Sequence, residues 1–440
     1  MKIGVLAQYL DTRQDIGDIL RSLALQHEIT IYVRPTDLVK IKSLRDLKIA
    51  VITIPAFSGQ EKILILVWQY LYLLLGQIPK SSYNYYMTEH IKLLNSDIKP
   101  FQRFLHLSLL TLSRLPIKFM RYDQFLNGLL LIRKEAEFDP EIDFFLCFTQ
   151  IYHDWTFASI LQQKKPVWVY VYSWDHPCKM KTFSKKVNYL VWHEGIKADT
   201  ADLQEINPTK IHVLGATQFA YIHDFLSSKP TSQRSPPVHS PYIYLGCATG
   251  YANLAKQEIR YCALIAEHML ENLPHWTLVI KPYPFLKNTA LYDHLGCLPN
   301  VVIHQKAVGY DDSRYQKFNK INQARAFFHF GTTMGYEAGY FKTPSFLLDF
   351  ADPKKDKLLN GFIHQYQNDK YLNAGEGYNV IRSDAELIEV MKHLAHENTD
   401  DYNNDKIRQT MELDSFDGIT RKLITLIEAG CRNEAYEVNL

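Results

Sequence analysis

The chain has 440 residues, a net charge of +2 and a hydrophobic fraction of 47%, which is ample for large buried cores. At about 150 residues per domain, this length predicts two or three domains. The near-neutral balance, with no basic tail or long run of like charges, excludes nucleic acid as the main partner. Six scattered cysteines, none in a CxxC pair or beside a histidine cluster, indicate reduced cytoplasmic thiols and predict no metal site.

The N-terminal residues predict a strand, a helix and a second strand. The strands are the apolar runs 2–8 and 29–33, the first of which is too short for a signal peptide. We expect Asp11 or Thr12 to cap the helix between them and Asp15 to lie near its positive end. Strand, helix and strand in this order predict a parallel sheet. Apolar side chains repeat at the spacing of one helix face at Ile16, Ile19, Leu20, Leu23 and Ala24.

Two apolar segments follow. Residues 63–78 carry almost no charge, but sixteen residues fall short of the about 20 that span a bilayer. The favoured interpretation is a buried helix, and the alternative is a membrane-surface contact beside a lipid-linked acceptor. Residues 104–132 fit either an interfacial helix or a core helix with a solvated face, because basic residues interrupt the leucines. We therefore expect a cytoplasmic protein and leave open a peripheral contact at the inner face of the cell membrane. The basic residues in question are Arg114, Lys118 and Arg121.

Short strands rich in β-branched and aromatic residues then alternate with helices. Near-continuous apolar strands of this kind are typical of parallel sheets that are covered on both faces. In the first half they are predicted at 143–149, 167–173, 187–193 and 211–214. In the second half they are predicted at 242–247, 276–281, 301–304, 326–330 and 345–349. Helices are predicted at 252–272, from Thr333 onward, at 384–396 and at 418–429.

A segment rich in proline and serine, residues 227–241, separates the two halves. Its four prolines and scarcity of aliphatic residues predict an interdomain linker. The predicted domains are residues 1–226, with a helical insertion at about 61–135, and residues 242–440, whose last helix is left free to cross back. The predicted fold class is α/β, with two Rossmann-like, doubly wound domains facing across a cleft.

In open α/β sheets, ligands bind beyond the carboxyl ends of the strands, so the residues after each strand are candidate ligand contacts. The clearest candidates are Gly331, Thr332 and Thr333, at a strand-to-helix turn. Glycine lets the backbone approach a ligand closely, and hydroxyls beside the N–H groups of a helix start suit a phosphate. Glu337, one turn into the helix, could bind both hydroxyls of a ribose. The alternative is an ordinary helix capped by Thr333 with Glu337 in solvent, and the local pattern favours neither.

A second candidate contact follows the strand at 276–281. This strand ends in Lys281, and Tyr283 stands between two prolines just beyond it. Lys281 could neutralise a phosphate as a point charge, and Tyr283 could stack on a base or donate a hydrogen bond. The alternative is a proline-rich turn with a surface lysine. Gly246, near the end of the strand at 242–247, is assigned to the same site.

Candidate general bases follow strands of the first half. One strand exit yields Asp175 and His176, and another yields His193 and Glu194. A histidine with a carboxylate at a strand exit suits base catalysis, although a lone pair of this kind is more often structural. Asp11, in the first strand–helix loop, is a further candidate, and its alternative role is to cap the helix.

Five motifs occur in a fixed order across about residues 165–350. The first half carries a serine–tryptophan–aspartate stretch, a "VW" pair and a "KIHV-G-x-x-QF" run, at Ser173–Asp175, Val191–Trp192 and Lys210–Phe219. The second half carries an "IRPHP"-like strand exit and a hydroxyl-rich helix start followed by a glutamate, at Ile280–Pro284 and Thr332–Glu337. Together these motifs resemble a family of bacterial surface-carbohydrate glycosyltransferases of GT-B-like fold. That family is distantly similar to CDP-glycerol glycerophosphotransferases and UDP-GlcNAc 2-epimerases.

The resemblance implies metal-independent glycosyl transfer from a nucleotide sugar to a polysaccharide, lipopolysaccharide or lipid-linked acceptor, with no cofactor. The leaving phosphate would be stabilised by N–H groups of a helix start, since no Asp-x-Asp motif follows a strand. Nucleotide-sugar contacts are assigned to Gly246, Lys281, Tyr283, Gly331, Thr332, Thr333 and Glu337. Candidate catalytic residues on the acceptor side are Asp11, Asp175 and His176.

Two residues depart from the pattern of the family. Tyr283 stands where the family has the histidine of "HP", and Ala220 stands where an aspartate usually follows "QF". Because that histidine contacts the nucleotide phosphate in related enzymes, Lys281 is expected to carry more of the phosphate contact here. Two other functions stay open, since one fold hosts many functions. A nucleotide-sugar epimerase or hydrolase would need no acceptor, and a non-catalytic scaffold of polysaccharide assembly would bind no nucleotide.

Overall fold

The computed structural model forms two compact units. Unit 1 comprises residues 1–89, 99–223 and 413–440, and unit 2 comprises residues 90–98 and 224–412. Most of the predicted linker, residues 229–239, lies outside the described residues. The structure describes residues 1–7, 13–34, 49–77, 100–113, 115–148, 155–174, 176–179, 182–228, 240–248, 252–283, 289–304, 310–341, 343–349, 352, 354–356, 359–360, 363, 379–396, 402 and 404–437.

Unit 1 is built on a parallel sheet with the strand order β3-β2-β1-β4-β5-β6-β7. Every residue of β4, β5 and β6 is buried, which is the continuous apolar pattern that a sheet with two covered faces requires. The strands are β1 (Lys2–Ala7), β2 (Glu28–Val33), β3 (Ile49–Thr53), β4 (Phe144–Phe148), β5 (Val167–Tyr170), β6 (Asn188–Val191) and β7 (Ile211–Val213).

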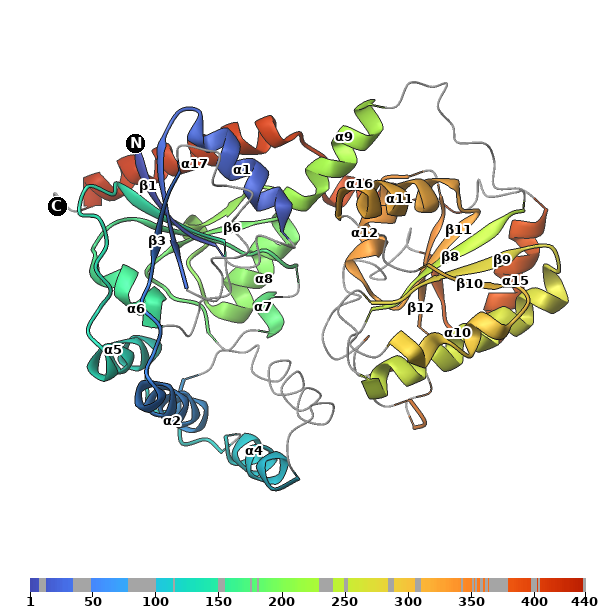
Figure 1. Ribbon diagram of the computed structural model, residues 1–440, viewed down its shortest axis with the longest axis horizontal. Coiled ribbons are helices and arrows are strands. Elements are labelled where there is room, and N and C mark those ends of the chain that lie inside the picture. The colour runs from blue at the N-terminus through green and yellow to red at the C-terminus, as the bar shows by residue number, and fades with distance from the viewer. Residues whose placement is uncertain are drawn as a thin grey trace. The chain divides into compact units, whose positions relative to one another are not determined.

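The helices of unit 1 include the first and the last of the chain, α1 and α17, which lie side by side (Figure 1). α1 buries the predicted apolar face, but it begins at Gln14, and the N-cap position belongs to Arg13, which makes no side-chain capping bond. The predicted cap at Asp11 or Thr12 is therefore wrong, and both residues lie outside the described ranges. The helices are α1 (Gln14–Ala24), α2 (Gly59–Leu75), α4 (Pro100–Leu112), α5 (Tyr122–Ile132), α6 (Trp155–Gln162), α7 (His176–Lys179), α8 (Glu194–Gln204) and α17 (Phe416–Glu437), and α9 (Ala220–Ser228) continues into unit 2.

Unit 2 is built on a second parallel sheet, with the strand order β10-β9-β8-β11-β12-β13. Helices α10 and α15 cover one side of it, and α11, α12 and α16 lie on the other (Figure 1). The strands are β8 (Tyr242–Gly246), β9 (Thr277–Lys281), β10 (Val301–Ile303), β11 (Ala326–His329), β12 (Ser345–Leu348) and β13 (Asn379–Ile381). The helices are α10 (Ala252–Asn272), α11 (Tyr310–Gln323), α12 (Thr333–Gly339), α15 (Asp384–Ala395) and α16 (Asp405–Thr410).

The predicted fold class is confirmed in both units. Counted within each unit, the first six strands run in the order 3-2-1-4-5-6, which is the order of doubly wound, Rossmann-like sheets. The predicted strands form at slightly shorter bounds, whereas the edge strands β3 and β13 and the helix α11 are not among the predicted elements. In each unit the strand order reverses beside the first strand, between β1 and β4 and between β8 and β11.

The apolar segment 63–78 forms most of α2. A capping box starts this helix, since the Ser58 hydroxyl and the Glu61 carboxylate each accept a hydrogen bond from the other's backbone N–H. α2 buries only Tyr72 and Leu73, so the interpretation of this segment as a buried helix is wrong. In the part of the chain that is described, no helix is both long and apolar enough to cross a membrane.

Candidate functional site

The carboxyl ends of three neighbouring strands of unit 2 lie in one row. Gly246 of β8 pairs in register with Lys281 of β9 on one side and with His329 of β11 on the other. The N–H of Cys247 donates to the carbonyl oxygen of Lys281 at 3.0 Å, which continues the row past the strand ends. The loops after β8 and β11 flank the reversal of strand order, where ligands bind in doubly wound sheets. The fold thus brings Gly246, Lys281 and the turn at Gly331 to one edge.

The turn from β11 into α12 has a fixed shape. Gly331 has a φ of +77°, in the left-handed region that favours glycine. Thr332 occupies the N-cap position, and its hydroxyl accepts a hydrogen bond from the N–H of Met334 at 3.4 Å. The cap is therefore Thr332, and Thr333 is the first helical residue. Both threonines are half-buried.

Two glycines let α12 lie directly against the strand ends. A Cβ on Gly246 would stand 3.0 Å from the Phe327 ring and 3.4 Å from the sulfur of Met334. A Cβ on Gly335 would stand 2.6 Å from Cε1 of the His329 ring. Any larger side chain at Gly335 would push α12 away from the sheet. Glycine at this position therefore keeps the start of α12 beside the ends of β8 and β11.

His329, which the sequence pattern does not single out, supports this turn from below. Its Nδ1 accepts a hydrogen bond from the N–H of Gly331 at 3.1 Å. The side chain is buried, and burial lowers its pKa from 6.5 to about 3, so the ring is neutral at physiological pH. A neutral ring keeps an acceptor for the Gly331 N–H, which a protonated ring would lose. The only sequence signal is a histidine two residues before a glycine at a strand end.

His329 is expected to make unit 2 less stable as the pH drops below 6.5. In the unfolded chain this histidine takes up a proton near pH 6.5, whereas in the folded chain it does so only near pH 3. Below pH 6.5 the unfolded state therefore binds more protons, and the free energy of unfolding falls by about 1.4 kcal/mol per pH unit. Urea unfolding of wild type and His329→Gln at pH 7 and pH 5 measures this. The wild type should lose about 2 kcal/mol more than the variant, and equal losses would contradict the assignment.

Glu337 is not solvated, in contrast to the alternative interpretation of this helix. Its Oε2 lies 2.6 Å from Nζ of Lys317 on α11, and the two side chains are only 13% and 19% exposed. The carboxylate is therefore held in place by a neighbouring helix, beside the same strand ends. Its predicted contact with a ribose stays a prediction.

The end of this row of strand ends at which Lys281 lies is positively charged. Burial, with the nearby charges of Lys281 and Lys320, lowers the pKa of His304 from 6.5 to about 4. Nδ1 of this neutral histidine lies 2.7 Å from the hydroxyl oxygen of Tyr244. Lys281 is half-buried, and so is Tyr283 two residues later. The site therefore offers a lysine ammonium, two hydroxyls and a positioned carboxylate along one sheet edge.

The predicted catalytic residues belong to unit 1. Asp11 and Asp175 lie outside the described residues. His176 is buried at the start of α7, and its ring meets the ring of Tyr172 edge-on, with centroids 4.8 Å apart. His193 is the N-cap of α8, and its Nδ1 accepts from the N–H of Gly195 at 3.1 Å. Because that ring caps a helix, it serves the structural role that lone His–Glu pairs more often have.

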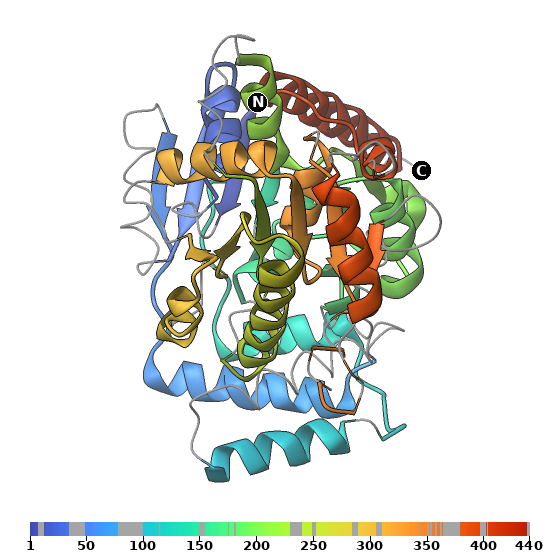
Figure 2. The ribbon, with the colours of Figure 1, turned by 90° about the vertical axis from the view of Figure 1, so that its right-hand side faces the viewer.

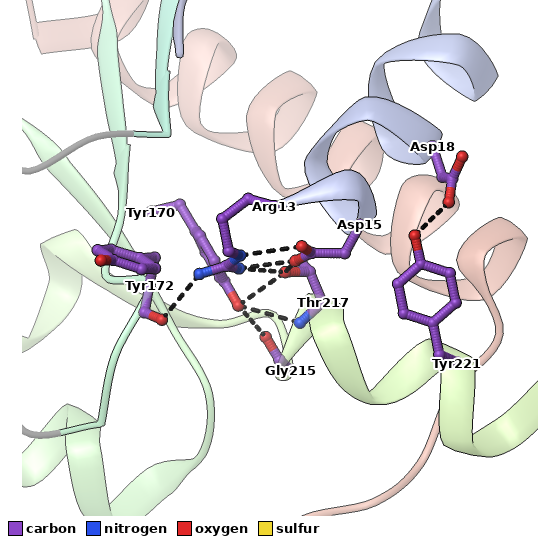
Figure 3. A network of polar contacts seen from close by, with 8 residues as sticks. All are labelled: Arg13, Asp15, Asp18, Tyr170, Tyr172, Gly215, Thr217 and Tyr221. Carbon is purple, nitrogen blue, oxygen red and sulfur yellow. Dashed lines mark hydrogen bonds and ion pairs between the residues drawn. The ribbon is translucent and has the colours of Figure 1, made fainter. Parts of the chain in front are cut away.

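A buried ionic network lies at the same edge of the unit 1 sheet (Figure 3). Nε and Nη2 of Arg13 donate to the Asp15 carboxylate at 2.9 and 2.6 Å, and the two side chains are 11% and 3% exposed. The hydroxyl of Thr217 also donates to Asp15, at 2.5 Å. The hydroxyl of Tyr170 accepts from the N–H of Thr217 at 3.0 Å, which joins the ends of β5 and β7 to the start of α1.

The network reaches His176 through an aromatic ring. The Arg13 guanidinium lies over the ring of Tyr172, with its carbon 4.6 Å from the ring centroid, and it donates to the Tyr172 carbonyl oxygen. Burial alone would lower the pKa of Arg13, but the charge and hydrogen bonds of Asp15 outweigh it and raise the pKa, so the guanidinium stays charged. This network is not among the predicted features, and its only signal in the sequence is an arginine and an aspartate two residues apart after the first strand.

Comparison with known proteins gives a likeness of structure only. No protein-family model matches the sequence, and neither does any curated protein. The fold is similar to the UDP-GlcNAc 2-epimerase of Methanocaldococcus jannaschii, with a TM-score of 0.51 and 13% identity over 97% of this chain and 100% of that one. It is also similar to a glycosyltransferase of Rickettsia africae, with a TM-score of 0.50 and 10% identity over 97% of each chain. The chain thus has the expected GT-B-like fold of two Rossmann-like units, which it shares with such epimerases and glycosyltransferases.

Proposed function

We propose that the protein is a glycosyltransferase that moves a sugar from a nucleotide-sugar donor to a glycan or lipid-linked acceptor without a metal. The observation that carries this proposal is the row formed by Gly246, Lys281 and the Gly331 turn, at the reversal of strand order in unit 2. Ligands of doubly wound sheets bind at this position. A phosphate-bearing ligand suits the groups that are present there, and the ordered motifs of the sequence support a sugar nucleotide.

Different residues of unit 2 bind different parts of the donor. The Lys281 ammonium offsets the charge of the diphosphate, and the hydroxyls of Thr332 and Thr333 donate hydrogen bonds to its oxygens. Because α12 has only seven residues, these side chains rather than a long helix dipole supply the attraction. Glu337, fixed by Lys317, accepts hydrogen bonds from the ribose. Tyr283, which stands at the position of the family's histidine, stacks on the base.

These groups favour transfer because they bind the leaving nucleotide. As the bond from sugar to phosphate breaks, negative charge grows on the phosphate oxygens, and a lysine already in place stabilises that charge without rearrangement. Unit 1 holds the acceptor hydroxyl. If the reaction inverts the anomeric centre, a base must take the hydroxyl proton, and Asp11, Asp175 and His176 are the proposed sources.

A nucleotide screen tests the proposal. The melting temperature of the full chain is followed with UDP, CMP, CDP, GDP and ADP, and a ligand of the folded state should raise it in a concentration-dependent way. The corresponding nucleotide sugar is then incubated with and without an acceptor glycan, and the products are analysed. We expect release of the nucleotide only with the acceptor present. Conversion of the nucleotide sugar without an acceptor would instead show an epimerase or a hydrolase. If no nucleotide binds, the function that agrees with the result is a non-catalytic scaffold.

A further inference from the structure

The exposed apolar side chains of unit 1 are concentrated in one part of the chain. Of the 20 large hydrophobic side chains that are exposed in the described residues, 13 lie between Ile63 and Leu131. Three phenylalanines are among them, with Phe101, Phe104 and Phe119 exposed by 74%, 68% and 62%. Single exposed hydrophobic residues are common on soluble proteins, but so many within one segment of the chain indicate an interaction surface.

The elements that carry these side chains contact one another and are joined by hydrogen bonds. α2 and α4 run side by side (Figure 2), and the hydroxyl of Tyr70 on α2 hydrogen-bonds the ring of His106 on α4 at 2.6 Å. Nζ of Lys118 donates to the carbonyl oxygen of Leu74 at the end of α2, which ties residues 115–119 to the same helix. We call the exposed apolar side chains of α2, α4 and residues 115–119 the apolar face.

In the described residues 59–77, 100–113 and 115–132, which include the apolar face, basic side chains outnumber acidic ones by four to two. From Gly59 to Ile132 the sequence has eight basic and four acidic residues, whereas the rest of the chain has 41 basic and 43 acidic residues. Lys62, in the first turn of α2, and Arg121, shortly after residues 115–119, are exposed. The segment is therefore basic in a protein whose remainder is slightly acidic, and this combination of apolar and basic groups suits a negatively charged lipid surface.

We propose that the apolar face binds the surface of an anionic phospholipid bilayer, with α2 and α4 lying in the plane of the interface. α2 has 17 residues and is about 25 Å long, which is too short to cross the bilayer but sufficient to lie in it. A second copy of the chain is the less favoured occupant, because it would bring two basic segments together. The proposal is independent of the donor site in unit 2.

Vesicle flotation of the full chain tests this surface. Wild type should float with vesicles of phosphatidylcholine and phosphatidylglycerol, less with phosphatidylcholine alone, and less as salt concentration rises. The triple variant Leu64→Gln, Phe101→Gln and Phe104→Gln should bind the anionic vesicles at least about tenfold more weakly, because it removes apolar area from the interface. Leu25→Gln with Val302→Gln is the matched control, since both side chains are exposed outside the apolar face and should leave binding unchanged.

Two further measurements keep the result interpretable. Circular dichroism and the melting temperature should match between the triple variant and wild type, because the replaced side chains contribute little to the core. Lys62→Glu with Arg121→Glu, which leaves every apolar residue in place, should weaken binding to anionic vesicles only. The proposal is overturned if wild type floats with neither vesicle or the triple variant binds as wild type does. It is also overturned if wild type is a dimer that the triple variant converts to a monomer, since the apolar face would then bind a second copy.

Discussion

Replacement of Lys281 by alanine is expected to lower kcat/KM for the nucleotide sugar by about 10- to 100-fold, because it removes a charge-assisted contact with the phosphate. Lys281 lies in register with Gly246 in the row of strand ends, and its side chain is half-buried rather than fully solvated. The loss should fall on both binding and turnover, since the charge on the phosphate is present in the donor and grows as the nucleotide leaves. Steady-state kinetics with a saturating acceptor measure it.

The matched control is Lys256→Ala, which removes an exposed lysine of α10 in the same unit and should change kcat/KM less than about twofold. Lys281→Arg should recover part of the activity, because it keeps the charge in a different shape. Glu337 is better tested by glutamine than by alanine, since the amide oxygen of glutamine can still accept a hydrogen bond from the largely enclosed Lys317, whereas alanine offers no acceptor. A Lys281→Ala enzyme with the same melting temperature and wild-type kcat/KM would refute the site.

Replacement of Asp15 by alanine is expected to lower the free energy of unfolding of unit 1 by about 3–5 kcal/mol. The Asp15 carboxylate accepts hydrogen bonds from Arg13 and from Thr217, and all of these groups are largely enclosed. Without the carboxylate, a charged guanidinium stays buried with no counter-ion, and its desolvation is no longer offset. Urea unfolding followed by tryptophan fluorescence measures the change.

Asp18→Ala gives a control one turn further along the same helix. Asp18 accepts a hydrogen bond from the hydroxyl of Tyr221 at 2.5 Å and pairs with Arg21, but its side chain is 30% exposed. Water can replace these contacts in part, so the loss should be about 1–2 kcal/mol. The double variant Arg13→Met with Asp15→Leu, which removes both charges together, should be more stable than Asp15→Ala alone. Equal effects of Asp15→Ala and Asp18→Ala would show that burial of the network does not set its energy.

Periodicity and composition predicted the sheets well because buried parallel strands leave a continuous apolar signature. β4, β5 and β8 are fully buried, and all three follow from runs of apolar residues. The edge strand β3 was not predicted although four of its five residues are apolar, and at the edge of the sheet its side chains are half-buried or exposed rather than buried. β13 was also missed, because its three residues, Asn379–Ile381, hold only two apolar side chains and form no apolar run.

Only some residues of the candidate site could be predicted from the sequence, because several of its contacts join residues from different helices and strands. Glycine and threonine at a strand exit are visible along the sequence, as are Lys281 and its prolines. The pairing of Glu337 with Lys317 joins two helices, and its existence depends on how α11 packs. The contact of His329 with Gly335 likewise depends on the seating of α12. Interactions of this kind become visible only when the sheet order is known.

For the helix α2, the sequence could not predict whether the helix is buried or exposed. Its apolar segment is shorter than a bilayer-spanning helix, but the same apolar composition suits a buried helix and a surface helix equally. Burial is decided by what packs against the helix, which the composition of the helix itself does not reveal. Leu64 and Val67 are exposed although they lie amid apolar neighbours. Composition therefore identified an unusual segment but assigned it to the wrong environment.

Hydrogen–deuterium exchange of the full chain, with and without the nucleotide that raises its melting temperature most, tests the central claim most directly. We expect slower exchange with nucleotide in the peptides that contain the ends of β8 and β9 and the turn from β11 into α12, at Gly246–Ala248, Lys281–Tyr283 and Phe330–Glu337. Peptides around the Arg13 network of unit 1 should exchange at the same rate with and without nucleotide alone. Protection confined to unit 1, with no change at those three segments, would contradict a donor site at the strand ends of unit 2.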